Sequence, residues 1–352
     1  MLVYLLIDLV VIMIGVETYQ KTKKNWALVL SCVMLVFFAG LRGEFTSDYQ
    51  SYSDYFLKIS RNVKLSEILS PFRRFSMEKG FVLLCKLIGF VTDSPVVFFT
   101  IVSALTLSLY FCGFKKLSAM PVLSVLLFVG VGDYYATYNL VRQTLAAAIV
   151  FYGLSLWAQN KRIKFFLCLG IATLLHRTSL IVLPLVFLLE IKICTRNVVI
   201  ISCVGILASV VLSPIVKLGQ SLFAMYENYS YGMGEGTINA VIPQLAMLAF
   251  VAYSVLLTDC DFDVHDRRNR MLINASIFST IMMFMGMRIY ILSRFAYYLK
   301  PAFWVLVPNV IASYSKETDR RIVLVIVSLL SVAFTWVTLS GTGYEPYYFY
   351  FQ

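Results

Sequence analysis

The chain has 352 residues, of which 60% are hydrophobic and 14% are charged, and its mean hydropathy is +0.80. A soluble globule of this size needs more polar surface than this composition supplies, so we expect lipid to be the solvent of the chain. The formal net charge of +11 does not indicate nucleic-acid binding, because the basic residues punctuate apolar segments instead of gathering in one polar domain.

Long apolar runs predict an all-α polytopic membrane protein. The runs approach or reach the roughly 20 residues that a helix needs to cross hydrocarbon, and they do not alternate as barrel strands do. With the shorter apolar segments they predict about twelve transmembrane helices in a single membrane domain over residues 1–352. The long runs lie at 2–18, 25–41, 96–114, 197–218, 240–258, 271–287, 293–313 and 322–340.

Clusters of basic residues predict the orientation, because cytoplasmic loops carry an excess of Lys and Arg. Taking the clusters as cytoplasmic places both termini and two long loops, about 43–95 and 219–239, on the outer face. Segment 78–92 must then be a short re-entrant or surface helix, since a further crossing would move Lys115 and Lys116 outside. The clusters are Lys21/Lys23/Lys24, Lys115/Lys116, Lys161/Arg162/Lys164, Lys192/Arg196, Arg267/Arg268/Arg270 and Lys316/Arg320/Arg321.

With this orientation, several polar residues fall at the outer ends of different helices. An Arg at the edge of hydrocarbon is costly and is therefore a functional candidate, although a terminal Arg also snorkels to headgroups. Several guanidinium groups on one face fit an anion, and we expect phosphate or diphosphate, which Arg binds through a planar fork. The residues are Arg42, Arg142, Gln143, His176, Arg177, Arg288 and Arg294.

Arg142 and Gln143 open the predicted helix 140–158, directly after the polar and aromatic segment 133–139. This segment has the composition of an outer loop that leads into a helix N-terminus, where free N–H groups favour an anion. The alternative is an aromatic belt at the membrane interface, which Tyr-rich segments commonly form. Both interpretations stay open from the sequence.

His176 interrupts the apolar residues 163–190, which form either two short helices or one long helix broken at this point. It is a candidate proton acceptor or a group that orients a hydroxyl, and the alternative is a structural histidine. Asp48, Tyr52 and Glu78 lie in the first long outer loop. Carboxylates, hydroxyls and aromatic faces commonly hold sugars, although any solvated loop has similar residues.

The acidic residues Asp259, Asp261, Asp263 and Asp266 do not match a calcium loop, because Val264 and Arg270 occupy the positions that need Gly and Glu. We expect a solvated cytoplasmic loop there. Seven cysteines without CxxC spacing indicate neither a disulfide framework nor a metal cluster. The sequence has no P-loop, GxSxG, HExxH or dinucleotide motif, so ATP-driven transport and the usual soluble hydrolase chemistry lose support. We expect no cofactor, and no metal because the arginines can neutralise the charge of an anion.

Five short motifs in order give the chain a resemblance to the EpsG/Wzy-type family of polysaccharide repeat-unit polymerases. Together they span residues 40 to about 298. They are Gly40-Leu41-Arg42-Gly43 followed by Asp48 and Tyr52, Glu78-Lys79-Gly80-Phe81, Asn139-Leu140-Val141-Arg142-Gln143-Thr144-Leu145-Ala146, Leu175-His176-Arg177-Thr178-Ser179, and Ser293-Arg294-Phe295 with Tyr297 and Tyr298.

The resemblance implies a GT-C-like membrane glycosyltransferase that acts on the outer face of the bacterial cytoplasmic membrane. It would transfer a growing O-antigen, capsule or exopolysaccharide glycan from undecaprenyl diphosphate to the terminal sugar of another lipid-linked unit, with a chain-length regulator protein as a possible partner. Arg142, His176 and Arg294 would be catalytic. The substrate-binding residues would be Arg42, Asp48, Tyr52, Glu78, Gln143, Arg177 and Arg288.

Three alternatives remain open at this stage. A flippase or transporter of lipid-linked oligosaccharide needs the same arginines, but it also needs a polar path across the membrane. An O-antigen ligase uses the same donor and a different acceptor. A membrane acyltransferase with His176 as its base leaves the arginines without a role.

Overall fold

The computed structural model describes residues 3–4, 6–11, 26–70, 74–194, 196–197, 200–201, 203–205, 207, 241–287, 290–340 and 346–351. Within these ranges the regular structure is helical, apart from isolated β-bridges that join Arg42 to Phe349 and Cys260 to Tyr314. The all-α prediction is therefore confirmed for this part of the chain. The residues form two compact units, one from Met1–Leu180 with Thr318–Gln352 and the other from Ile181–Glu317.

Three described helices are long and apolar enough to cross a membrane, namely α6 (Pro95–Leu117), α9 (Val141–Ala158) and α17 (Glu317–Leu339). Shorter apolar helices include α2 (Trp26–Gly40), α7 (Pro121–Gly130) and α13 (Ile242–Leu257). These helices show a membrane protein, while the count of about twelve crossings stays a prediction. The predicted run 197–218 and the loop 219–239 lie mostly or wholly outside the described residues.

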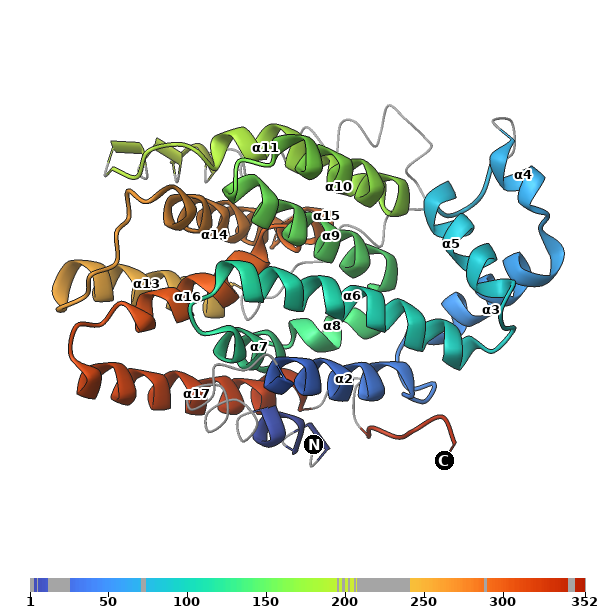
Figure 1. Cartoon of the computed structure of the whole chain (residues 1–352), viewed down its shortest axis with the longest axis horizontal. Helices are drawn as coiled ribbons and strands as arrows, with labels where there is room; N and C mark the ends of the chain where they lie inside the picture. The colour runs from blue at the N-terminus through green and yellow to red at the C-terminus, as the bar shows by residue number, and fades with distance from the viewer. Residues whose placement is uncertain are drawn as a thin grey trace. The chain divides into compact units, whose positions relative to one another are not determined.

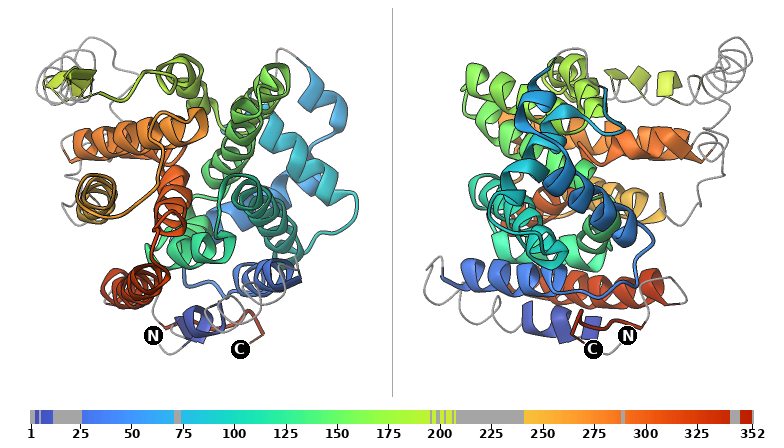
Figure 2. Two further views of the ribbon diagram at one scale, coloured as in Figure 1. Left: turned by 60° about the vertical axis from the view of Figure 1, so that its left-hand side comes forward. Right: turned by 90° about the vertical axis from the view of Figure 1, so that its right-hand side faces the viewer.

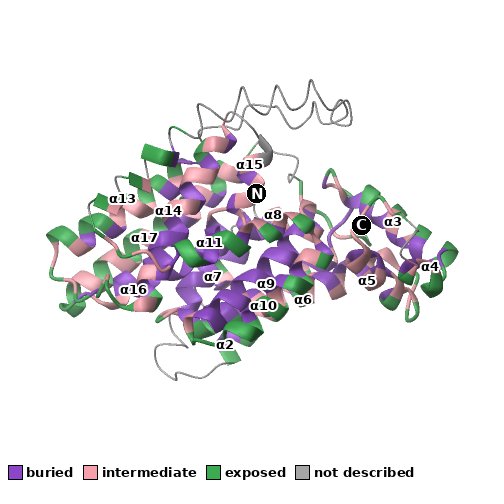
Figure 3. Cartoon of the chain, turned by 90° about the horizontal axis from the view of Figure 1, so that it is seen from above, coloured by how far each residue is buried: buried purple, intermediate pink, exposed green. Residues whose placement is uncertain are grey.

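Helix α9 lies at the centre of the first unit, with α6 on one side and α10 (Arg162–Leu175) on the other (Figure 1). Most of its residues are buried, as its purple ribbon in Figure 3 shows. The run Ala146, Ala147 and Ala148 has no exposed surface, and small side chains of this kind let membrane helices approach closely. The beginning of α9 is therefore held in place by a closely packed core.

Three short helices lie between α2 and α6 along the chain and make up most of the first predicted outer loop. They are α3 (Tyr49–Asn62), α4 (Leu65–Leu69) and α5 (Lys79–Gly89). Helix α5 packs against α3, as Figure 2 shows in blue and cyan, and against the end of α10. Its 11 residues span about 16 Å at 1.5 Å per residue, so it is too short to cross hydrocarbon, in agreement with the prediction of a short helix at 78–92.

Gly80 makes the contact between α5 and α10 possible. A Cβ atom at this position would lie 2.5 Å from the backbone oxygen of Leu174, near the end of α10. Such a distance is a steric clash, so glycine is needed for the close approach. The beginning of α5 is thereby held against the residues that precede His176.

The segment 133–139 is helix α8 (Asp133–Asn139), so the prediction of an outer loop is wrong. Tyr134, Tyr135 and Tyr138 have no exposed surface and pack edge to face against one another. Buried rings cannot form an interfacial belt, so that alternative is also wrong. Aromatic burial, with its large apolar area, explains why a polar-looking segment enters the core.

Two further predictions concern breaks in apolar runs. The run 163–190 breaks at His176, which ends α10 in an extended conformation and is followed by η1 (Arg177–Ile181) and α11 (Val182–Leu188). The predicted single run 293–313 is instead α15 (Tyr290–Ala296), η4 (Lys300–Ala302) and α16 (Phe303–Ala312). Pro301 lacks an N–H group and its ring hinders a continuous helix, which accounts for the second break.

Helix α14 (Arg267–Gly286) is a long element of the second unit. The Asp266 side chain accepts hydrogen bonds from the backbone N–H groups of Arg268 and Asn269, at 3.0 and 3.1 Å, and so caps this helix. Asp259 forms an exposed ion pair with Lys316 at 2.8 Å. These contacts agree with the prediction that the acidic segment 259–266 is a solvated loop.

Candidate functional site

The carboxylate of Glu78 contacts residues from two other parts of the chain. Its Oε2 accepts a hydrogen bond from Arg142 Nη1, while its Oε1 accepts one of 3.2 Å from the backbone N–H of Arg177. Oε1 also lies 3.6 Å from Arg177 Nε and 3.4 Å from His176 Nδ1. We call Glu78, Arg142, His176 and Arg177 the Glu78 cluster.

Each member of the Glu78 cluster is positioned by the end of a helix. Glu78 is the residue before the first turn of α5, Arg142 is the second residue of α9, and His176 and Arg177 follow α10. Helix ends leave backbone N–H or C=O groups without partners inside the helix, so three ends that meet form a polar site within an apolar unit. The approach at Gly80 brings two of these ends together.

Burial within the Glu78 cluster changes from one side to the other. The side chains of Glu78, His176 and Arg142 are 12%, 14% and 21% exposed, while that of Arg177 is 82% exposed. The cluster is thus open at Arg177 and closed behind Glu78. Arg177 is therefore the member of the cluster that is most accessible to solvent.

The charges around Glu78 keep its carboxyl ionised. Burial by itself raises the pKa of this group, but the His176 imidazole, the charge of Arg142 and the Arg177 backbone N–H outweigh it and lower the pKa from 4.5 to about 2. At neutral pH the cluster therefore contains one carboxylate against two guanidinium groups. The excess positive charge fits a further anion.

Aromatic side chains support Arg142 from α3 and α5. Its Nε lies 3.4 Å from the Tyr52 hydroxyl, and its guanidinium carbon lies 5.9 Å from the centre of the Phe81 ring. Tyr52 packs edge to face on Phe81. These contacts hold the plane of the guanidinium group, which is the property that separates Arg from Lys at an anion site.

One ring nitrogen of His176, Nδ1, faces the Glu78 carboxylate. Nδ1 is buried and makes no hydrogen bond with any residue that the structure describes, and Glu78 Oε1 lies 3.4 Å from it. This distance is long for an N–H···O hydrogen bond. Catalytic hydrogen bonds are often long in structures without substrate and shorten in the reacting complex.

Asp48 contacts the residue that ends α8, just before α9 begins. Its backbone N–H donates a hydrogen bond of 3.4 Å to the Asn139 side chain, three residues before Arg142. The Asp48 side chain is partly exposed. The structure thus brings Asp48, Tyr52, Glu78, Arg142, His176 and Arg177 to one end of the first unit.

Arg42 occupies a different environment, because its side chain is 1% exposed. The guanidinium group donates hydrogen bonds to the backbone oxygens of Ala39 and, at 2.9 Å, Tyr138, and it lies 4.5 Å from the centre of the Phe99 ring. The C-terminal segment covers it from outside, since Gly43 N–H donates to Tyr348 O at 2.8 Å. Arg42 therefore joins α2 to α8 within the core.

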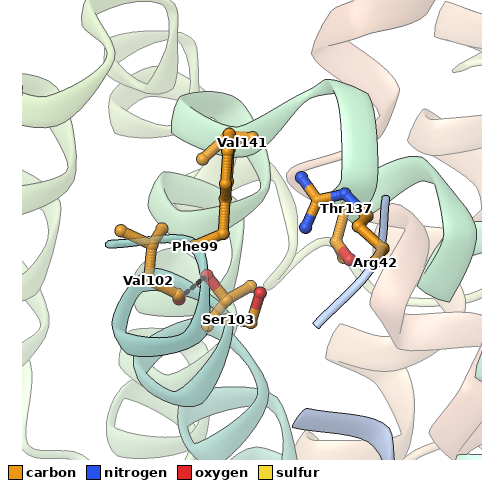
Figure 4. A pocket seen from close by; sticks show the side chains of 7 residues that line it. Arg42, Phe99, Val102, Ser103, Thr137 and Val141 are labelled. Atoms are coloured by element: carbon orange, nitrogen blue, oxygen red, sulfur yellow. Dashed lines mark hydrogen bonds between the residues drawn. The ribbon is translucent and has the colours of Figure 1, made fainter. Parts of the chain in front are cut away.

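A small pocket beside Arg42 has a volume of about 10 Å³ (Figure 4). This is roughly the room of one water molecule, and it is too small for a phosphate group. Its lining residues are Arg42, Phe99, Val102, Ser103, Thr106, Thr137 and Val141. The Glu78 cluster is therefore a better candidate site for an anion than the pocket beside Arg42.

The other predicted site residues lie outside this cluster or outside the described residues. Gln143 is 3% exposed and lies in the core. Arg294 is in α15 of the second unit and is partly buried. Arg288 is among the residues that the structure does not describe.

Sequence reasoning missed Phe81 and Gly80 as parts of the site architecture, although both belong to the quoted Glu78-Lys79-Gly80-Phe81 motif. A glycine in the first turn of a helix is an available signal, since it is unfavourable there without a packing reason. For metal binding, no group of three His, Cys, Asp or Glu side chains occurs among the described residues. The expectation of no metal stays a prediction.

Comparison with known proteins identifies the chain through one family model. The model of the EpsG family matches residues 25–351, nearly the whole sequence. No curated protein and no solved structure matches the chain. The matched region contains both the Glu78 cluster and Arg294, and the family is one of Wzy-type polysaccharide polymerases. The chain therefore belongs to the EpsG family of polysaccharide polymerases.

Proposed function

We propose that this protein polymerises lipid-linked oligosaccharide repeat units by block transfer. The glycan on undecaprenyl diphosphate is transferred to the terminal sugar of a second lipid-linked unit, on the outer face of the cytoplasmic membrane, to build O-antigen, capsule or exopolysaccharide. The observation that supports this reaction most directly is the Glu78 cluster. Its two arginines exceed its one carboxylate, and a diphosphate leaving group needs such an excess.

In this mechanism, Arg142 binds the diphosphate and stabilises the negative charge that develops as the bond between the sugar and the phosphate breaks. Electrostatic stabilisation of this kind is commonly worth about 3–4 kcal/mol for one positioned group. Arg177, exposed at the open side, makes the first contact with the lipid diphosphate. The roles of Arg294 and Arg288 in diphosphate binding stay predictions from the sequence.

The acceptor sugar is assigned to His176 and Asp48. His176 contacts the acceptor hydroxyl or the second phosphate, and the partly exposed Asp48 and the Tyr52 hydroxyl contact sugars. Arg42 and Gln143, which are buried, support the site from the core. The arginines neutralise the charge of the diphosphate, so the reaction is proposed to need no metal.

The test is an incubation of the purified protein with a lipid-diphosphate-linked repeat unit extracted from cells that lack the protein, followed by a gel. We expect a ladder of glycan lengths from the wild-type protein, with and without a chelator. Arg142→Lys keeps the charge but loses the planar fork, and we expect at least about a 100-fold loss of polymer.

Arg162→Lys is the matched control, because Arg162 is exposed and lies over the Trp157 ring at the other end of α9. A normal ladder from Arg142→Lys would remove Arg142 from the site. Loss of the ladder with chelator and its return with a divalent cation would contradict the metal-independent mechanism. Single repeat units that accumulate on the inner membrane face in a deletion strain would indicate a flippase, and transfer of whole glycans to a different acceptor would indicate a ligase.

A further inference from the structure

The two oxygens of Glu78 face different partners, and this division suggests a role for Glu78 other than sugar binding. Oε2 bonds to Arg142, which is assigned to the leaving group, while Oε1 faces His176. The carboxylate thus lies between the residue that holds the diphosphate and a residue on the acceptor side. A carboxylate in this position can act both on the residue that binds the leaving group and on the residue that contacts the acceptor.

The ring of His176 has a defined orientation relative to Glu78. Nδ1 is buried, and Glu78 Oε1 at 3.4 Å is the acceptor that faces it. A carboxylate that stays ionised favours the tautomer with its proton on Nδ1, which leaves the Nε2 lone pair as the proton acceptor. The backbone of His176 is held as well, because its N–H donates a hydrogen bond of 2.8 Å to Ala172 O at the end of α10.

We infer that Glu78 is a positioning residue that holds His176 as the general base of the transfer. This inference rests on the proposed polymerase function. His176 Nε2 takes the proton from the acceptor hydroxyl, and the acceptor oxygen forms a bond with the anomeric carbon of the donor glycan. The bond between that carbon and the diphosphate oxygen breaks, and its electron pair leaves with the lipid diphosphate.

A second contact of Glu78 defines the competing explanation. Arg142 and Glu78 form an ion pair, so a purely structural Glu78 would act only by holding Arg142. Removing it would then weaken binding of the lipid diphosphate. A Glu78 that acts through His176 changes the rate of transfer instead, because the imidazole loses its orientation while the diphosphate still binds.

The experiment is a pair of double-mutant cycles on the purified full-length protein in detergent. Glu78→Gln is combined with His176→Ala in one cycle and with Arg142→Lys in the other, and kcat and KM are measured with the lipid-diphosphate-linked repeat unit. We expect Glu78→Gln to lower kcat about 10- to 100-fold with KM changed less than about threefold. In the His176→Ala background, the same substitution should change kcat less than about twofold.

Two controls separate this result from loss of structure. Glu78→Asp keeps the charge with one fewer methylene group, and we expect it to recover part of the lost kcat. Asp54→Asn removes an exposed carboxylate from α3, where it accepts a hydrogen bond from Gln50, and we expect wild-type kinetics. Size-exclusion profiles show whether each variant is folded, and if Glu78→Gln fails, the cycle is run with Glu78→Asp.

Each outcome decides the inference. Coupling in kcat between Glu78 and His176 supports it. A full effect of Glu78→Gln in the His176→Ala background, or a rise in KM coupled only to Arg142, overturns it and leaves the polymerase function standing. If the wild-type protein makes no polymer, the proposed function fails and this inference fails with it.

Discussion

Two carboxylates in this protein each face two arginines, and their surroundings differ. In the first unit Glu78 faces Arg142 and Arg177, with His176 beside it. In the second unit Glu190 faces Arg267 and Arg270. The charges are nearly the same, so the two clusters are compared by how the carboxylate is bonded and how exposed the arginines are.

In the Glu190 cluster, Glu190 and Arg267 are closely bonded, while Arg270 Nη2 lies 3.6 Å from Glu190 Oε2 and its buried Nε makes no hydrogen bond with the described residues. Arg267 Nε lies 3.0 and 3.1 Å from the two carboxylate oxygens, and Nη2 bonds to Oε1 as well. The Asn274 side chain bonds to the backbone oxygens on both sides of Glu190, at 3.0 and 2.8 Å. Such a fork-to-fork pair fastens the beginning of α14 to the segment after α11.

The Glu78 cluster is more open to solvent. The His176 ring makes only a long contact, and the Arg177 side chain is mostly in solvent. A forked Arg–carboxylate pair shielded from solvent is expected of a structural contact, whereas an exposed guanidinium group beside a buried one is expected where a ligand binds. The comparison therefore favours a structural role for the Glu190 cluster and ligand binding at the Glu78 cluster.

The largest expected difference is in stability. Glu190→Gln leaves Arg267 and Arg270 without their carboxylate, and we expect the free energy of unfolding to fall by about 2 kcal/mol, less than for a fully buried pair because these side chains are 19–27% exposed. Polymer formation per folded molecule should stay within about twofold of wild type. Thermal unfolding in detergent and the ladder assay measure the two quantities. A large loss of activity in folded Glu190→Gln would end the distinction between the clusters.

A smaller effect is expected where α5 meets α10. Gly80→Ala places a methyl group against Leu174 O, so we expect a loss of about 1–2 kcal/mol in stability and a lower kcat, because Glu78 moves away from His176. Gly170→Ala in α10 is the control, since a Cβ atom there meets no atom within 4 Å. Alanine also favours the helix, so this control should be unchanged or slightly stabilised. Equal behaviour of the two variants would show that the close approach does not position the site.

The smallest expected effect is on the pH dependence of stability. The pKa of Glu78 is lowered to about 2 in the folded protein, so its stabilising contribution is present above the unfolded value of 4.5 and is lost as the pH falls through 2. The full shift corresponds to about 3 kcal/mol, and access of water beside Arg177 reduces this, so we expect about 1 kcal/mol. The stability difference between wild type and Glu78→Gln should narrow between pH 5 and pH 3 on thermal unfolding, which gives a readout independent of catalysis. A constant difference over this range would show that Glu78 is not held ionised by its neighbours.

Sequence reasoning succeeded where one segment carries its own signal. Apolar length predicted the helices α6, α9 and α17, and the polar interruption of an apolar run predicted the break at His176. It failed at the tyrosine segment 133–139, where composition suggested a loop and the rings instead fill the core as α8. Composition reports the polarity of a residue, but burial of an aromatic ring depends on the neighbours that surround it.

By itself, the sequence determined that this chain is helical and lies in a membrane, and it identified the ionisable residues that apolar segments retain. These properties follow from local composition, because each helix satisfies its own backbone in lipid. Only the tertiary structure decided that Glu78 joins Arg142, His176 and Arg177, while Arg42 and Gln143 are enclosed in the core. The physical reason is that such contacts depend on how helix ends meet, and here that meeting depends on the absence of one side chain at Gly80.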